Sequence, residues 1–113
     1  MRGEQLIVEV VPSEGCVTVR LVGELDLSTA ALVREAALAA MRQHLPVIRV
    51  DLSGVIFMDS TGLEALLATR RRAALEGGQL ALVNPGRYVM RLLEISGLDQ
   101  LFEIEEDDSA SVG

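Results

Sequence analysis

The chain contains no lysine and only one cysteine, one histidine and three aromatic residues among its 113 positions. The absence of lysine excludes Schiff-base chemistry and the lysine of a P-loop. The single cysteine excludes an internal disulfide and a metal site built from clustered cysteines. The scarcity of aromatic side chains argues against a base-stacking surface and a large aromatic ligand pocket. The core is therefore expected to consist of Leu, Val, Ile and Ala.

The two rare side chains that could carry chemistry have ordinary explanations. Cys16 lies at the start of a predicted strand, where we expect it to pack, since free cysteines are usually buried. His44 lies near the end of a predicted helix, just before Pro46. A charge at a helix C-terminus or a solvated side chain is favoured there over catalysis, because no nucleophile–base pattern surrounds it.

Length and charge limit the possible partners. A chain of 113 residues suits one domain with its own core. The net charge of -7 makes direct binding of nucleic acid unexpected, because a phosphate backbone requires a basic surface. No stretch approaches the roughly 18 apolar residues of a membrane span, and the first residues lack the apolar run of a signal peptide. We therefore expect no membrane span and a cytoplasmic location.

Hydrophobic periodicity predicts an α/β fold. The predicted order is β-β-α-β-α-β-α-β, with no internal repeat. Strands that alternate with helices imply a mostly parallel sheet, and the short turn between the first two strands implies an antiparallel N-terminal edge strand. The predicted strands are 6–11, 16–23, 47–52, 79–83 and 101–104, and the predicted helices are 30–43, 63–76 and 87–96.

The helices are expected to pack on the sheet through apolar stripes. The stripe residues are Leu32, Val33, Ala36, Ala37, Ala40 and Met41 in the first helix, Leu63, Leu66, Leu67 and Ala74 in the second, and Val89, Leu92 and Leu93 in the third. We expect residues 1–104 to form the single domain and residues 105–113 to form a mobile acidic tail.

Small polar residues occupy the junction between a buried strand and the second helix. Asp59, Ser60, Thr61 and Gly62 lie at this junction, where the free N–H groups and the dipole of a helix favour an anion. A hydroxyl at this position could carry a phosphate that a partner senses. The alternative is that Asp59, Ser60 and Thr61 only cap the helix, and Thr61 with Glu64 fits a capping box. The local residues alone favour caps over a regulatory site.

A second acidic residue is expected on the same rim. Asp26 follows the second strand, and Asp26 or Ser28 can cap the helix that comes next. Functional loops of parallel sheets lie at the carboxyl ends of the strands, so we expect Asp26 to lie on the same rim as Ser60.

Three ordered motifs resemble one family. Residues 51–63 read DLSGVIFMDSTGL and closely resemble the signature of bacterial anti-sigma factor antagonists, which are small STAS-domain proteins. Residues 20–26, RLVGELD, resemble the second-strand motif of that family. Asn84 and Pro85, followed by ISGL at 95–98, resemble its third-helix region. The likeness extends over residues 6–104, and three ordered motifs are more specific than Asp-Ser-Thr-Gly alone.

The resemblance implies a regulatory function rather than an enzyme. In that family the antagonist binds an anti-sigma factor that is also a serine kinase, and this binding releases a sigma factor. The kinase phosphorylates the serine after the motif aspartate, here Ser60, and a metal-dependent phosphatase restores it. The resemblance places Asp26, Asp59, Thr61 and Gly62 at the partner contact, with Gly62 giving the partner room to approach. It implies no cofactor.

Other functions remain open at this point. STAS domains also serve as scaffold subunits of stress-sensing assemblies or transporter complexes, and fold does not fix function. A serine hydrolase would require a histidine base and a different serine context. A receiver domain would require a lysine. Arg70, Arg71 and Arg72 and the acidic residues of 103–108 are expected to be solvated, with a partner contact as the alternative for the arginines.

Overall fold

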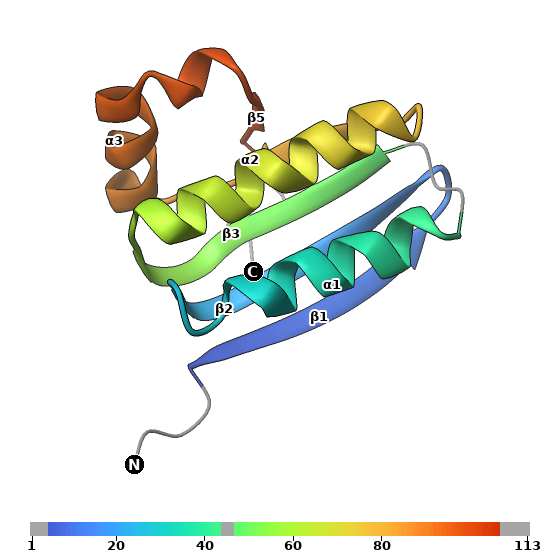
Figure 1. The fold of residues 1–113 in the computed structure, drawn as a ribbon, viewed down its shortest axis with the longest axis horizontal. Helices are drawn as coiled ribbons and strands as arrows, with labels where there is room; N and C mark the ends of the chain where they lie inside the picture. Colours follow the sequence, from blue (N-terminus) through green and yellow to red (C-terminus); the bar gives the residue numbers. More distant parts are fainter. Residues whose placement is uncertain (1–4, 44–46, 107–113) are drawn as a thin grey trace.

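The computed structural model describes residues 5–43 and 47–106. Figure 1 shows the arrangement of its elements. The element order confirms the predicted β-β-α-β-α-β-α-β pattern and adds a short 3₁₀ helix before the last strand. The elements are β1 (Leu6–Ser13), β2 (Cys16–Leu25), α1 (Ala30–Met41), β3 (Val47–Met58), α2 (Ser60–Leu75), β4 (Gln79–Val83), α3 (Arg87–Ser96), the 3₁₀ helix (Leu98–Gln100) and β5 (Glu103–Glu105).

The five strands form one sheet in the order β1-β2-β3-β4-β5. β1 pairs with β2 in an antiparallel manner, and all the other pairs are parallel. The tight hairpin is possible because Gly15 adopts a φ of 77°, a conformation that glycine tolerates. The predicted α/β fold, a mostly parallel sheet with an antiparallel N-terminal edge, is therefore confirmed.

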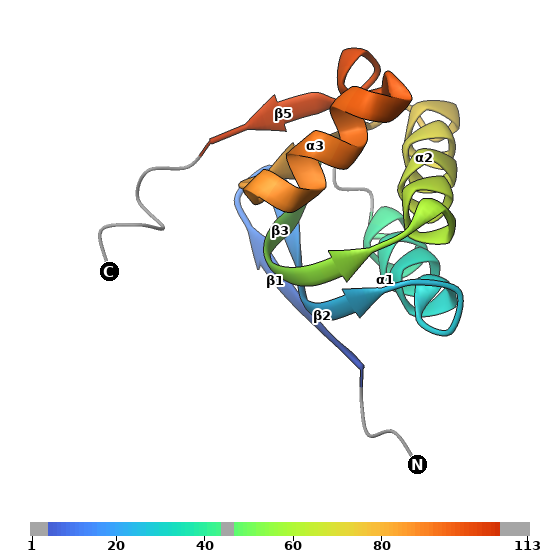
Figure 2. The same cartoon turned by 90° about the vertical axis from the view of Figure 1, so that its left-hand side faces the viewer.

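Two helices cover one face of the sheet. α1 and α2 lie side by side on this face, and α3 packs at one end of the molecule next to β3 (Figures 1 and 2). The core between the helices and the sheet is aliphatic, as the composition predicts. Its fully buried members include Val17, Val19 and Leu21 on β2, Ile48, Val50 and Leu52 on β3, Val33 on α1, Leu66 on α2, and Leu93 on α3.

The structure confirms the predicted apolar stripes only in part. The prediction is wrong for Leu32, which is 45% exposed, and for Ala74, which is exposed. Leu32 lies beside the edge strand β1, beyond which no further strand covers it. On α2 the predicted Leu63 and Leu66 are buried, and so are Gly62, Ala65, Thr69 and Ala73, which the prediction did not include. In α3, Val89 and Leu93 are buried as predicted.

The second and third strands are longer than predicted. β2 continues to Leu25 and β3 continues to Met58, six residues beyond the predicted end. The two strands stay paired through two register shifts and end at the Leu25–Met58 pair. Because the strands end together, the loops that follow them begin next to one another at the carboxyl edge of the sheet.

Ion pairs link several strands of the sheet. Arg20 lies 3.5 Å from Glu9 and 3.6 Å from Asp51, and Arg49 lies 2.9 Å from Glu105. Glu105 is the last residue of β5, whereas the sequence predicted that the domain ends at residue 104. The rest of the acidic tail, 107–113, and the predictions for His44 and Pro46 lie outside the described residues.

In the part of the chain that the structure describes, no helix is both long enough and apolar enough to span a membrane.

Candidate functional site at the carboxyl edge of the sheet

Asp59 caps the helix on which Ser60 is the first residue. Asp59 has extended backbone dihedrals, and its side chain accepts hydrogen bonds from the N–H groups of Thr61 and Gly62 at 3.0 and 3.2 Å. These bonds satisfy two of the free donors at the start of α2. The capping interpretation is therefore confirmed for Asp59. The capping box at Thr61 is wrong, because α2 starts three residues earlier than predicted and Thr61 lies inside it.

Ser60 points outward next to this cap. The residue is exposed, and within the described residues its hydroxyl makes no hydrogen bond to the protein. Because Asp59 satisfies the helix terminus, Ser60 is not needed as a cap. Its oxygen is accessible to a reagent or a partner.

Gly62 is buried at the packing contact between α2 and the end of β2. A Cβ at this position would meet the Leu25 carbonyl oxygen at 2.5 Å and side-chain carbons of Leu25 and Met58 at 2.9 Å. The space that glycine leaves is therefore filled by the protein itself. This differs from the expectation that Gly62 gives a partner room to approach.

Asp26 lies in the neighbouring loop, between β2 and α1. Its carboxylate accepts hydrogen bonds from the backbone N–H of Ser28 at 3.0 Å and from the Ser28 hydroxyl at 2.7 Å. The Ser28 hydroxyl, helped by backbone and Thr29 hydrogen bonds, lowers the pKa of Asp26 below its ordinary value. Asp26 is thus a partly exposed, ionised group in the loop before α1, whose N-cap residue is Thr29.

The edge of the sheet brings these residues together. Leu25 and Met58 are paired, and the Asp59 N–H donates to the Leu25 carbonyl at 3.3 Å. Asp26 and Ser60 each lie one or two residues beyond this contact, so the predicted common rim exists. The helices α1, α2 and α3 also all begin at this edge, where their N-terminal dipole ends favour added negative charge.

Comparison with known proteins shows the family to which this chain belongs. The sequence matches the STAS domain family over residues 8–109. It is 31% identical over 105 residues to the anti-sigma-B factor antagonist of Bacillus subtilis, an alignment that covers 93% of this chain and 95% of the relative. The chain belongs to the STAS-domain anti-sigma factor antagonist family. The resemblance of the three sequence motifs is thereby confirmed at the level of the family.

Solved structures of this family have the same fold. An anti-sigma factor antagonist from Mycobacterium paratuberculosis superposes with a TM-score of 0.81 at 30% identity, covering 92% of this chain and 88% of that one. The anti-sigma factor antagonist SpoIIAA in its unphosphorylated form superposes with a TM-score of 0.74 at 27% identity, covering 95% and 92%.

In this STAS domain, exposed apolar side chains that the sequence motifs did not indicate lie at the same edge of the sheet as Ser60. The apolar rim consists of Leu27, Ile56, Phe57 and Tyr88, which are 80, 74, 41 and 47% exposed. Phe57 stacks on Tyr88 with ring centroids 6.3 Å apart, and the Tyr88 hydroxyl donates to the Met58 carbonyl at 3.0 Å. Large exposed apolar groups around a polar centre are typical of protein–protein contact sites.

A signal for part of the apolar rim was present in the sequence. Ile56 and Phe57 immediately precede Met58 and Asp59, so extending the strand to the motif would have placed them beside the site. Tyr88 could not be placed in this way, because only the fold brings the start of α3 to the end of β3.

Proposed function

We propose that this protein is an anti-sigma factor antagonist whose activity is controlled by phosphorylation of Ser60. It binds an anti-sigma factor that is also a serine kinase, and this binding releases a sigma factor. The observation that carries the proposal is the exposed hydroxyl of Ser60 at the N-terminus of α2, with the helix already capped by Asp59. The names of the relatives support an anti-sigma partner.

The contact surface and the modification site coincide in this proposal. The apolar rim supplies the buried area of the complex, and Asp26, Asp59 and Thr61 supply its polar contacts. A kinase must hold the acceptor hydroxyl in line with the γ-phosphate of ATP. The partner surface must therefore enclose Ser60, and a phosphate left there lies inside the interface.

Electrostatics explain how one modification can end the interaction without unfolding the protein. A phosphoserine adds a charge of about -1.5 to -2 at neutral pH. The N-terminus of α2 tolerates this charge, so the fold is maintained. In the complex, the phosphate is placed beside Asp59 and the kinase's own ATP site, where charge mismatch weakens binding.

The antagonist is a substrate in this cycle and not its catalyst. The kinase supplies ATP, metal ion and base, and a metal-dependent serine phosphatase removes the phosphate afterwards. The cycle takes place in the cytoplasm, where the sigma factor acts. Within the domain, Gly62 contributes by fixing the position of α2 against Leu25 and thus the direction of Ser60.

The direct test is phosphorylation of the wild type and of Ser60→Ala. The Ser60→Ala protein, which lacks the acceptor oxygen, is first used to capture the anti-sigma factor from cells that contain it. The purified factor is then incubated with ATP and either protein, and intact mass is measured. We expect one phosphate on the wild type and none on Ser60→Ala.

A control variant makes this result specific. Ser53→Ala removes another exposed serine, on β3, outside the proposed contact. This variant is expected to accept one phosphate as the wild type does. A phosphate on Ser60→Ala, or its loss in Ser53→Ala, would place the acceptor elsewhere.

A further inference from the structure

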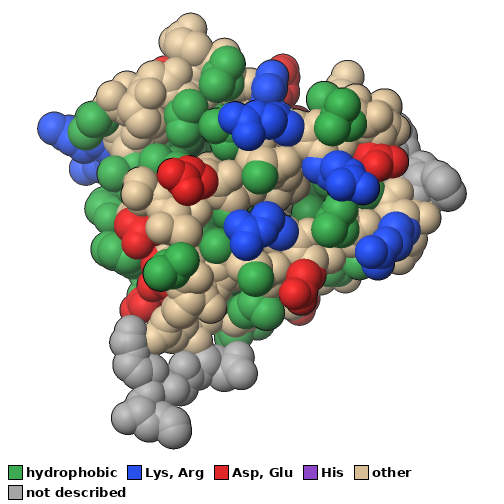
Figure 3. Space-filling view, in the orientation of Figure 1, with side chains coloured by type: hydrophobic (Ala, Val, Ile, Leu, Met, Phe, Trp, Pro, Cys, Tyr) green, Lys and Arg blue, Asp and Glu red, His purple; other side chains and the backbone are tan. Residues whose placement is uncertain are grey.

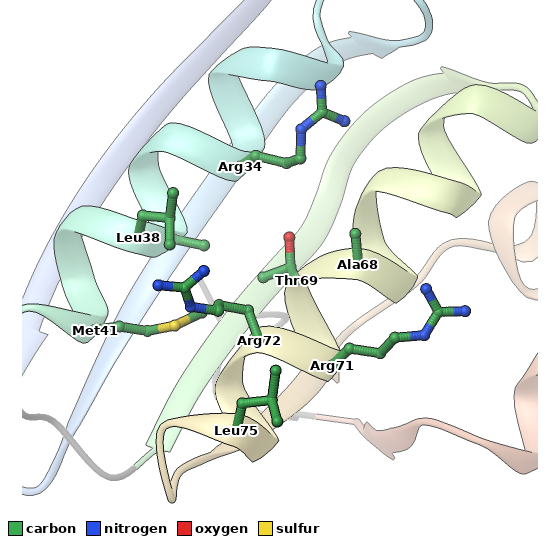
Figure 4. Close-up of a pocket in the computed structure, with 9 residues that line it drawn as sticks. Arg34, Leu38, Met41, Ala68, Thr69, Arg71, Arg72 and Leu75 are labelled. Carbon is green, nitrogen blue, oxygen red and sulfur yellow. The ribbon is translucent and has the colours of Figure 1, made fainter.

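A groove of about 300 Å³ lies between α1 and α2, lined by residues 34–41 of α1 and by the C-terminal half of α2. Figure 4 shows the side chains that line it. Ala37 and Thr69 are buried at its base, while apolar and arginine side chains form its walls. The wall residues used below are Leu38, Met41, Leu75, Arg34, Arg71 and Arg72.

Positive charge is concentrated on this face of an acidic protein. α1 and α2 carry four arginines and two glutamates, whereas the whole chain has a net charge of -7. Figure 3 shows arginine side chains standing among apolar ones over these helices. Arg72 pairs with Glu76 at 3.0 Å in an exposed ion pair. Within the described residues, Arg34 and Arg71 form no ion pair.

Helix stability alone does not account for this arrangement. Basic residues near a helix C-terminus offset the dipole, which is a sufficient reason for Arg71 and Arg72. Arg34 lies in the first half of α1, seven positions before its end at Met41, where the dipole gives no such benefit. In Figure 4, Arg34 and Arg72 extend from opposite helices into the space between them.

The apolar part of the groove is also unused by the core. Leu75 is 83% exposed, and Leu38 and Met41 are only partly buried. An exposed apolar strip flanked by arginines would fit a ligand that presents a row of apolar side chains with carboxylates along both edges of that row. An amphipathic acidic helix has this pattern, and helices commonly bind in grooves through anchors at three- and four-residue spacing.

We propose that the groove between α1 and α2 docks an acidic amphipathic helix of the anti-sigma partner. Its apolar side chains contact Leu38, Met41 and Leu75, and its carboxylates pair with Arg34, Arg71 and Arg72 in charge-assisted hydrogen bonds. The identity of the partner rests on the proposed function. The net charge of the chain opposes a nucleic acid as the occupant.

The groove is separated from the modification site along α2. Ser60 and Arg71 lie eleven residues apart on one helix, which at 1.5 Å per residue is about 17 Å. This is roughly twice the screening length of about 8 Å at physiological ionic strength. The groove therefore contributes affinity that a phosphate on Ser60 leaves unchanged, and it holds the partner at the correct orientation in both states.

The chemistry of the groove is tested with a designed peptide. The probe is a capped peptide of about four helical turns, with leucine at i, i+3, i+4 and i+7 and glutamate elsewhere. A scrambled peptide of the same composition is the control. With the wild-type protein carrying labelled Leu and Met methyl groups, the ordered peptide is expected to shift the signals of Leu38, Met41 and Leu75 saturably. The scrambled peptide is expected to bind at least tenfold more weakly.

The partner is tested with variants of matched charge. Arg34→Gln combined with Arg72→Gln removes two positive charges, and Arg91→Glu on α3 changes the net charge equally outside the groove. In calorimetry against the captured anti-sigma factor, the double variant is expected to bind about tenfold more weakly. The same loss is expected in a Ser60→Asp background, because distant sites are additive. Arg91→Glu should remain within twofold of the wild type.

Several results would overturn the proposal. In the peptide experiment, the absence of methyl shifts or equal binding of the ordered and scrambled peptides would do so. In the partner experiment, an unchanged affinity of the double variant, with a circular dichroism spectrum like that of the wild type, would do so. A wild-type dimer that the double variant loses would assign the groove to a second copy. If the peptide binds but no anti-sigma factor does, the proposed function fails and the groove belongs to a different protein partner.

Discussion

At the scale of single residues, the helix cap and the proposed modification site are adjacent side chains, Asp59 and Ser60. The sequence predicted both functions for the same short stretch and could not divide them. The structure places the cap on Asp59, which accepts hydrogen bonds from two N–H groups of α2, and it leaves Ser60 exposed. The backbone dihedral angles at the junction between β3 and α2 decide which residue caps the helix. Asp, Ser and Thr can all adopt the dihedral angles of a cap, so the residue types alone do not identify it.

Gly62 should be intolerant of even one added methyl group. Alanine is favoured over glycine in a helix by about 1 kcal/mol, but overpacking costs about 1–3 kcal/mol. Here the Cβ would meet the carbonyl oxygen of Leu25, which is backbone and cannot rotate away. We expect Gly62→Ala to lower the free energy of unfolding by on the order of 1 kcal/mol, as measured by urea denaturation.

The matched control for this prediction is Thr61→Ala, at the preceding position of the same helix. It adds no atom and should change the unfolding free energy by no more than about 0.5 kcal/mol. If Gly62→Ala were as stable as the wild type, the close packing of α2 on β2 would be contradicted.

The pKa of Asp26 should depend on Ser28. Because the Ser28 hydroxyl lowers the pKa of Asp26 in the folded protein, its contribution to stability is present above the ordinary aspartate pKa. This contribution is lost as the pH falls through the lowered value. We expect Ser28→Ala to raise the Asp26 pKa toward its ordinary value in a carboxyl-carbon NMR titration. An unchanged pKa would mean that the Ser28 hydroxyl does not hold the carboxylate.

At the scale of elements, the sequence predicted the kind and order of every strand and α-helix, but not the 3₁₀ helix or where all the elements end. The last six residues of β3 include glycine and serine, which are poor strand formers, and pairing with β2 overrides this preference. Because β3 continues to Met58, only Asp59 separates it from α2, which therefore starts at Ser60. Exposure of Leu32 could not be predicted from periodicity, because it depends on which strand lies at the edge of the sheet.

The start of α2 should lose stability when its cap is removed. Asp59→Ala leaves the N–H groups of Thr61 and Gly62 without their acceptor and is expected to cost about 1 kcal/mol of unfolding free energy. Asp59→Asn keeps an acceptor oxygen and should cost a few tenths of a kcal/mol. Equal stability of Asp59→Ala and the wild type in urea denaturation would contradict the assignment of the cap.

At the scale of the whole molecule, the proposed switch lies on a surface that the core does not use. Ser60, Asp26 and the apolar rim occupy the carboxyl edge of the sheet, while the aliphatic core lies between the sheet and the helices. The composition was sufficient to predict the core. The site required the fold, because Asp26, Ser60 and Tyr88 come from three separate parts of the chain. A charge added at this edge can therefore change binding without changing the fold.

The most direct test of this account is the affinity of the anti-sigma factor for the protein before and after stoichiometric phosphorylation of Ser60, measured by calorimetry. Amide NMR spectra of both forms would verify the fold. Binding is expected to be at least tenfold weaker after phosphorylation, with spectral changes confined to the carboxyl edge of the sheet. Equal affinity of the two forms would contradict it, as would weaker binding accompanied by loss of the folded spectrum.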